Sequence, residues 1–428
     1  MKVLLQKLLR LRPEHSESKR PKVLGPADPW MTATLIGLVA LGVVMVYSAS
    51  AVFAAQRYDN SLHFLVRQAF FAVAGVGTMF AIARIDYHRY RVLTYPGLFV
   101  AIAMLVFVAI GFGRSAGGAA RWIAIGPFNI QPAEPTKVML ILWLAYSLSK
   151  KREQMASFSI GFLPHVLMAG FLMLLCLKQP DFGSAIMIGA LTFVMLFTAG
   201  ARLKNLVGTL LIFAPMAAAL VLLSPYRMRR IQAFLNPFEH RQDVGYHITQ
   251  SFMSFGAGGV TGVGIGDSRQ KLLFLPEAHT DFISAIIGEE LGFVGILLLI
   301  GAFVFIVIRG LRAAGRAADD YGSYLAVGIT VFIGIQALTN LSVAMGLVPT
   351  KGLVLPFISY GGSSLLVNCA AAGILLNVSR PRQPVEWAAT GEGDVGDDEK
   401  QPVPQGRRPR RNRKPGEASI KVREGRAR

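Results

Sequence analysis

The stretch DFISAIIGEELGFVGILLLIGAFVFIVIR (residues 281–309) is flanked by charged residues and is apolar over most of its length. Its second half, residues 293–308, contains no charged side chain. Apolar runs of about 18 residues or more are long enough to cross the hydrocarbon core of a bilayer as a helix. Because backbone groups in lipid must be hydrogen-bonded internally, the stretch predicts a transmembrane helix.

The rest of the chain repeats this pattern. Of its 428 residues, 53% are hydrophobic and only 16% are charged, which is typical of a polytopic membrane protein. The alternation of apolar and polar residues that marks a membrane β-barrel is not seen. We therefore expect an all-α integral membrane protein of about ten transmembrane helices. They lie near residues 30–55, 64–84, 92–112, 136–149 (starting as early as Gln131), 157–177, 183–200, 205–223, 282–308, 322–346 and 355–378.

The distribution of Lys and Arg gives the orientation, since short inner loops are enriched in both. With the N-terminus inside, every inner segment is basic. An even number of helices places both termini in the cytoplasm, and the longest outer loop then joins helices seven and eight. The inner segments are KLLRLRPEHSESKRPK (7–22), RIDYHRYR (84–91), SKKRE (149–153), ARLK (201–204), RGLRAAGRAADD (309–320) and GRRPRRNRK (406–414).

Three regions are expected: a basic cytoplasmic tail (1–29), the membrane domain (30–380) and a disordered basic tail (381–428). The start of the first tail, KVLLQKLLRL, would form either a short amphipathic helix on the membrane or a disordered segment. Much of the net charge of +19 lies in the tails. We expect them to contact anionic inner-leaflet lipid rather than nucleic acid. The two cysteines, Cys176 and Cys369, lie within apolar runs and are expected to be buried thiols.

The outer segments are basic although topology disfavours this, which suggests an anionic ligand such as a phosphate. They are also rich in glycine, with six in residues 256–266, a composition that permits tight turns or backbone lining a cavity. Neither this run nor SYGGSS (359–364) is a nucleotide-binding loop. The outward basic residues are Arg114, Arg121, Arg227, Arg229, Arg230, Arg241, Arg269, Lys271 and Lys351.

Carboxylates at the head of the eighth span are the other unusual feature. Asp281 is either an acid in the first helical turn, with Thr280 as its N-cap, or a general base at the membrane boundary. Glu289 and Glu290 lie inside the span and need a function or a partner, for which Lys137 is one candidate. On a helix, Asp281 and Glu289 would stand about 12 Å apart along the axis. That separation does not suit the carboxyl pair of a glycosidase.

Location narrows the chemistry further. No pool of nucleotide sugars or ATP exists outside the cell membrane, so an outward-facing synthetic enzyme needs a substrate that arrives already activated. A lipid diphosphate meets this need: its diphosphate would attract the basic loops, and its isoprenoid tail would lie between helices.

Long motifs along residues 30–380 resemble those of the SEDS family (shape, elongation, division and sporulation) of polytopic peptidoglycan glycosyltransferases. They are RWIAIGPFNIQPAEPTK (121–137), KQPDFGSA (178–185), NPFEHRQDVGYHITQSF (236–252), QKLLFLPEAHTDFISAIIGEELGFVG (270–295) and GLVPTKGLVLPFISYGGSSLL (346–366). The forms PEAHTDF and PTKG are most similar to the division branch of the family.

The resemblance implies polymerisation of lipid II on the outer face of the cytoplasmic membrane, at the division septum, with polyprenyl diphosphate as the leaving group. Asp281 would be the catalytic general base. A class B penicillin-binding protein and other division proteins would be partners, and a divalent cation (Mg²⁺ or Mn²⁺) is a candidate cofactor, although no metal ligands are assigned. The residues expected to bind substrate are Arg121, Glu134, Lys137, Arg229, Lys271, His279, Lys351 and Ser363.

A few positions depart from the family pattern, among them Phe182 and Ser184 in PDFGS and Ser284 in HTDFIS. None removes a chemically necessary group. Three alternatives to the main prediction stay open: a lipid II flippase, the elongation or sporulation form of the same enzyme, and a scaffold that recruits division proteins.

Overall fold

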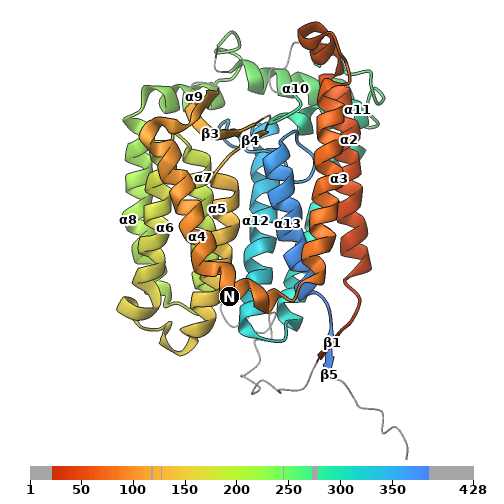
Figure 1. Ribbon diagram of the computed structural model, residues 1–428. Helices are drawn as coiled ribbons and strands as arrows, with labels where there is room; N and C mark the ends of the chain where they lie inside the picture. The colour runs from red at the N-terminus through yellow and green to blue at the C-terminus, as the bar shows by residue number, and fades with distance from the viewer. Residues whose placement is uncertain (1–21, 117–118, 127, 244, 272–277, 385–428) are drawn as a thin grey trace, which may run out of the picture. The chain divides into compact units, whose positions relative to one another are not determined.

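The computed structural model describes residues 22–116, 119–126, 128–243, 245–271 and 278–384. In this part of the chain, ten long helices run side by side between two ends (Figure 1). They are α2 (Pro29–Tyr58), α3 (His63–Arg84), α4 (Tyr90–Phe107), α5 (Ala133–Lys150), α6 (Leu163–Lys178), α7 (Phe182–Thr198), α8 (Leu203–Leu222), α11 (Ile283–Arg316), α12 (Asp320–Ala344) and α13 (Gly362–Val378).

The helices coincide with the ten predicted spans, and the chain is a multi-pass membrane protein. Within the described residues, seven helices are long and apolar enough to cross a membrane: α2, α3, α4 and α6 with their adjoining turns, α8, α11 and α12. Helices α7 and α13 are apolar but shorter, with 17 residues each. The 18-residue α5 carries buried charge. That all ten cross stays a prediction.

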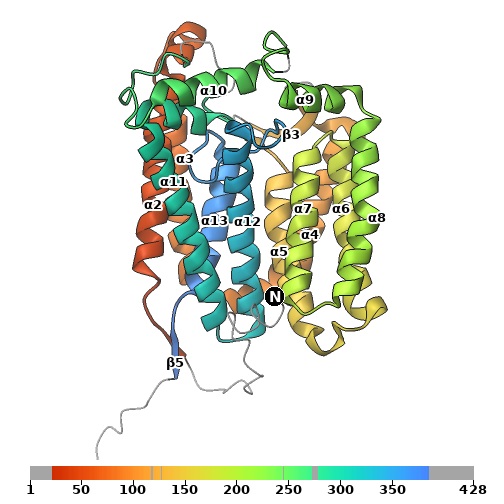
Figure 2. The same ribbon diagram turned by 180° about the vertical axis from the view of Figure 1, so that it is seen from behind.

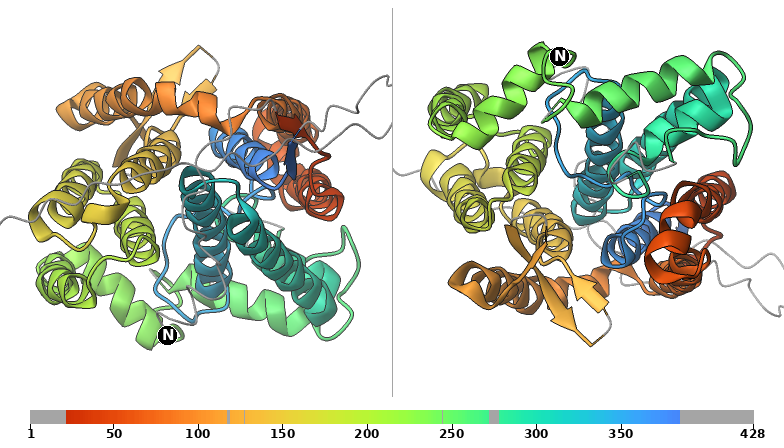
Figure 3. Two further views of the ribbon diagram at one scale, coloured as in Figure 1. Left: turned by 90° about the horizontal axis from the view of Figure 1, so that it is seen from below. Right: turned by 90° about the horizontal axis from the view of Figure 1, so that it is seen from above.

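Burial differs sharply between the helices. Helix α12 packs against α5, α7, α11 and α13, and 67% of its most apolar window is buried. Helix α8 is at the other extreme, since only 6% of its window is buried. Seen along the helices, α12 lies inside the arrangement and α8 at its edge (Figure 3). The apolar side chains of α8 therefore face the space that lipid occupies.

The helices differ from the predicted spans at two boundaries. The eighth span was expected to end near residue 308, whereas α11 continues past a non-helical residue, Gly292, to Arg316, because basic residues can extend a helix into water beyond the bilayer. The tenth span was expected from residue 355, whereas α13 begins at Gly362. The chain before it follows a buried, non-helical path through Pro356, which cannot donate a backbone hydrogen bond to a helix.

The predicted inner end is closed by a small sheet. Strand β1 (Lys22–Leu24) pairs antiparallel with β5 (Arg382–Pro384), so the segments that flank the helices meet (Figure 1). This extends the folded region slightly beyond the predicted limits of 30 and 380. Asp28, the N-cap of α2, also pairs with Arg309 of α11, Oδ2 to Nε, at 2.6 Å. The expected amphipathic stretch KVLLQKLLRL and the tail from residue 385 lie outside the described residues.

The opposite, outer end carries the structure that the sequence did not predict. Strands β2 (Arg114–Ala116), β3 (Ala119–Ile125) and β4 (Phe128–Ile130) form a three-stranded antiparallel sheet. In the long loop, α9 (Pro225–Leu235) and α10 (Tyr246–Gly258) lie across the ends of the long helices (Figure 2). Two of the predicted site residues, Arg121 in β3 and Arg229 in α9, belong to these elements.

Candidate functional site

Asp281 lies in a turn directly before α11 and is partly exposed. The predicted N-cap at Thr280 was wrong: the N-cap is Phe282, which has no side-chain capping bond. The Asp281 carboxylate faces Gly352 of the loop before α13, and a methyl group on Gly352 would stand 3.1 Å from Oδ2. The acid is thus presented at the outer end of the protein.

The backbone of Asp281 is held from α12. Buried Asn340 donates from Nδ2 to the carbonyl of Asp281 at 2.8 Å and to that of Leu353 at 2.7 Å. Its Oδ1 accepts from the hydroxyl of Ser284 at 3.1 Å. One amide therefore connects the turn that carries Asp281, the loop before α13 and the start of α11.

Two further hydrogen bonds join the turn that carries Asp281 to the loop before α13. Ser359 donates to the carbonyl of Thr280 at 2.6 Å, and the amide of Tyr360 donates to the carbonyl of His279 at 2.9 Å. The His279 ring, a predicted substrate ligand, lies 4.8 Å from the ring of Phe64 and 5.6 Å from that of Tyr360, centroid to centroid. His279 is therefore part of an aromatic cluster that secures the turn.

Two cations stand over one aromatic ring beside this turn. The ammonium of Lys351 lies 5.8 Å from the ring centroid of Phe182. The guanidinium carbon of Arg227 lies 5.1 Å from the same centroid. Within the described part of the chain, Lys351 forms no ion pair. Burial lowers the pKa of its ammonium below the ordinary value. A half-buried cation without a carboxylate is suited to bind an anion.

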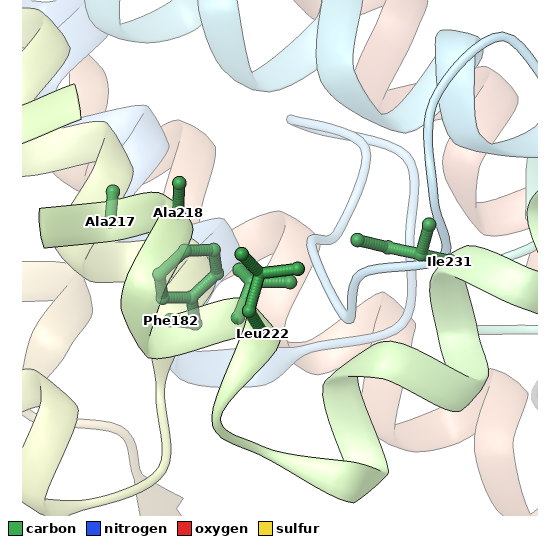
Figure 4. Close-up of a pocket in the computed structure, with 6 residues that line it drawn as sticks. Phe182, Ala217, Ala218, Leu222 and Ile231 are labelled. Carbon is green, nitrogen blue, oxygen red and sulfur yellow. The ribbon is translucent and has the colours of Figure 1, made fainter. Parts of the chain in front are cut away.

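Phe182 also lines a wide-open apolar cavity of about 330 Å³ between the start of α7, the outer end of α8 and α9 (Figure 4). The lining contains no charged side chain. Arg227 and Lys351 reach the same ring, so the arrangement offers an apolar space next to two cations, the two chemistries of a prenyl diphosphate. The lining residues are Phe182, Ala217, Ala218, Val221, Leu222 and Ile231.

A buried ion pair in α5 forms a second polar group. Lys137 Nζ lies 2.6 Å from Glu134 Oε1, and both side chains are almost fully buried. Glu134 Oε2 also accepts from Gln336 of α12 at 3.2 Å and from Ser364 of α13 at 3.5 Å. The neighbouring Ser363, which was the predicted ligand, is partly exposed in the first turn of α13.

The remaining predicted residues have different surroundings. Arg121 in β3 donates to the backbone carbonyls of Gln179 and Pro180, next to Phe182. Arg229 is exposed on α9. Lys271 is buried and pairs with Glu290 at 3.1 Å, so Glu290 does not pair with Lys137, as had been considered. The substrate-binding roles of these residues stay predictions.

Sequence reasoning missed Asn340 and Gln336. Both are amides inside an apolar helix, and they stand four residues apart, on one face of α12. Polar side chains within a span are costly unless they have partners. The presence of two amides in an apolar run was therefore the sequence feature that could have pointed to these residues.

The donor set does not provide a protein-only metal site. Among the described residues, no three His, Cys, Asp or Glu side chains gather closely enough to hold an ion.

Residues 29–383 match the sequence model of the FtsW, RodA and SpoVE family, described as cell cycle proteins. The chain belongs to this family. Over 362 residues it is 47% identical to a probable peptidoglycan glycosyltransferase FtsW of Trichlorobacter lovleyi, covering 84% of this chain and 95% of the relative. It is also 44% identical over 346 residues to stage V sporulation protein E of Bacillus subtilis, covering 80% and 94%.

Solved structures of the FtsW, RodA and SpoVE family share the fold. One is a chain of a peptidoglycan synthase complex that coordinates polymerization and crosslinking; it matches with a TM-score of 0.69 at 28% identity, over 82% of this chain and 97% of that one. The rod shape determining protein RodA of Thermus thermophilus matches with a TM-score of 0.62 at 27% identity, over 82% of this chain and 96% of that one. The family resemblance expected from the motifs is confirmed.

Proposed function

We propose that this protein is a peptidoglycan glycosyltransferase that polymerises lipid II into glycan strands on the outer face of the cytoplasmic membrane. The observation that carries the proposal is the position of the Asp281 carboxylate against Gly352, which follows Lys351 in the chain, a cation that forms no ion pair among the described residues. A base and an anion-binding group are the two chemical elements that this transfer needs. The names of the family relatives support the same activity.

In the proposed reaction, Asp281 removes the proton from the acceptor sugar hydroxyl. The oxygen then attacks the anomeric carbon of the lipid-linked donor and forms the new glycosidic bond. The bond between that carbon and the diphosphate oxygen breaks with inversion, and the polyprenyl diphosphate leaves with the electron pair. Lys351 and Arg227 stabilise the charge that develops on the diphosphate.

The apolar cavity beside Phe182 is the proposed place for the first isoprene units of the lipid. Its position next to Lys351 and Arg227 would let one molecule place its tail in the cavity and its diphosphate on the cations. We further propose that the protein works at the division septum with a class B penicillin-binding protein. The resemblance to a chain of a synthase complex supports such a partner.

One observation favours the alternative of a lipid II flippase. Helix α11 is interrupted within the membrane region, and interrupted helices form the substrate sites of many transporters. The backbone groups that the interruption frees are bound by the protein's own loop, however, and are not available to a substrate or ion. This favours the enzyme.

The test is polymerisation of fluorescent lipid II by the purified protein, with and without its cognate penicillin-binding protein whose transpeptidase is blocked by a β-lactam. Glycan polymer is the expected product. Well-folded protein that makes no polymer with its partner, yet moves lipid II between the leaflets of a vesicle, would establish the flippase instead.

A further inference from the structure

Helix α11 consists of two segments. At Gly292 the backbone adopts φ 66° and ψ −165°, which is outside the helical region, so residues 283–291 form an outer segment and residues 293–316 an inner one. Asp281 stands directly before the outer segment. The position of the acid therefore depends on what holds this short segment in place.

At the interruption, four backbone groups of α11 pair with the glycine-rich loop at residues 258–264. In a continuous helix, the carbonyls of residues 289 and 290 would accept from the amides of residues 293 and 294. Instead, each group pairs with the loop. Phe293 and Val294 donate to the carbonyls of Gly259 (3.0 Å) and Val260 (3.1 Å), and the carbonyls of Glu289 and Glu290 accept from Val263 (3.0 Å) and Gly264 (3.1 Å).

Contact between loop and helix is direct, backbone against backbone. A methyl group on Gly292 would stand 2.2 Å from the amide nitrogen of Gly262, and one on Gly258 would stand 2.0 Å from the carbonyl oxygen of Gly288. Only glycine fits such an approach, and the positive φ at residue 292 adds a second reason for glycine there.

The two carboxylates of the outer segment bind the same loop further along. Glu289 accepts from the hydroxyl of Ser268 at 2.6 Å and from the amide of Arg269 at 2.8 Å. Glu290 pairs with Lys271. Both carboxylates are buried. Glu290 Oε1 also accepts from the hydroxyl of Ser48 in α2 at 2.5 Å, while its Oε2 has no hydrogen-bond partner among the described residues.

We propose that Glu289 and Gly292 are positioning residues, which join the outer segment of α11 and loop 258–271 into one rigid unit that sets the place of Asp281. This rests on the proposed role of Asp281 as general base. A base must stand within hydrogen-bonding reach of the hydroxyl it deprotonates, and a displacement of about 1 Å can lower a rate on the order of 100-fold.

A matched pair of substitutions tests the proposal. Gly292→Ala places a methyl group against the loop backbone, whereas Gly301→Ala is the same change in the same helix at a site where, outside the adjoining helix backbone, no described atom lies within 4 Å of the added carbon. Both variants would be purified with the cognate penicillin-binding protein and given fluorescent lipid II. Amide hydrogen exchange would be followed over residues 259–271, 281–291 and 296–316.

In Gly292→Ala we expect exchange to rise in the loop and the outer segment but not in residues 296–316. The turnover number should fall on the order of 10–100-fold with KM for lipid II unchanged. Gly301→Ala should match the parent protein in both measurements. Equal exchange and equal turnover in the two variants would overturn the proposal.

Ser268→Ala keeps the test decisive where Gly292→Ala does not yield folded protein. It removes one donor to Glu289 and inserts nothing into the loop. Local exchange should still rise and the turnover number should fall severalfold; unchanged values in a folded variant would refute the proposal. Asp281→Asn separates the two ideas: if that variant polymerises normally the general-base proposal fails, while the exchange data still show whether loop and helix form one unit.

Discussion

The side-chain amide of Asn340 donates a hydrogen bond of 2.8 Å to the backbone carbonyl of Asp281. The bond runs from the largely buried helix α12 to a turn at the outer end, and the same amide reaches Leu353 in the loop that faces the carboxylate. A rigid helix thus supports both sides of the proposed catalytic centre. Interactions of this kind keep a reacting group in place without touching the substrate.

Replacing Asn340 with Ala should lower the turnover number on the order of 10–100-fold, because the turn that carries Asp281 loses its anchor. It should also cost about 1–3 kcal/mol of stability, since two carbonyls lose a donor. Lipid II polymerisation and the thermal midpoint would be measured together. Asn377→Ala is the matched control: Asn377 is equally buried, and its Nδ2 donates to the carbonyl of Ala83 at 2.9 Å near the opposite end. Equal losses of turnover in the two variants would show that Asn340 acts only through stability.

The ion pair between Glu134 and Lys137 allows a structural role to be separated from a functional one. Glu134→Gln should cost about 3–5 kcal/mol, because it leaves a buried ammonium uncompensated. The double variant Glu134→Leu/Lys137→Met should recover most of that stability, since both buried charges are removed. We expect both the single and the double variant to be inactive in lipid II polymerisation. Activity close to that of the parent protein would mean that the pair is not part of the substrate site.

Affinity for lipid II should depend on pH through Lys351. Burial lowers the pKa of this ammonium, so it loses its proton at a lower pH than an ordinary lysine. The charged form binds the diphosphate, and KM should therefore rise as pH increases from about 7 to about 10. Lys351→Arg should keep KM flat over this range because the guanidinium stays charged. A flat profile in the parent protein would rule out Lys351 as the titrating ligand.

Phe182 should contribute to the same affinity. Phe182→Leu keeps the apolar lining of the cavity but removes the ring beneath Lys351 and Arg227, which should weaken cation binding by about 0.5–2 kcal/mol and raise KM correspondingly. Phe182→Tyr retains an aromatic face and should leave KM nearly unchanged. Phe193→Leu, a change on the exposed side of the same helix, is the control. If Phe182→Leu has the KM of this control, the ring does not organise the cations.

The spans could be predicted because a bilayer demands a length of apolar sequence, and the ten helices coincide with that expectation. The interruption of α11 could not, since glycine is common in transmembrane helices and Gly292 gives no separate signal. The path of residues 355–361 was likewise missed, because an apolar run buried in protein has the same composition as one that spans lipid.

In the site, the expectation that Asp281 and the 346–364 loop lie at the same end of the protein followed from topology. The partners of the buried charges did not, since Lys271 with Glu290 and Lys137 with Glu134 are pairs set by tertiary packing. Asn340 was missed for the same reason. Only the fold shows that a polar residue of α12 stands beneath a turn about 60 residues earlier in the chain.

The most direct test of the central claim is the rate of lipid II polymerisation by Asp281→Asn in complex with the cognate penicillin-binding protein. The substitution keeps the shape of the side chain and removes its ability to accept a proton. The rate should fall on the order of 10²–10⁴-fold, with the thermal midpoint and hydrogen exchange of the parent protein preserved. A folded Asp281→Asn variant that polymerises within a few fold of the parent would contradict the assignment of Asp281 as the general base.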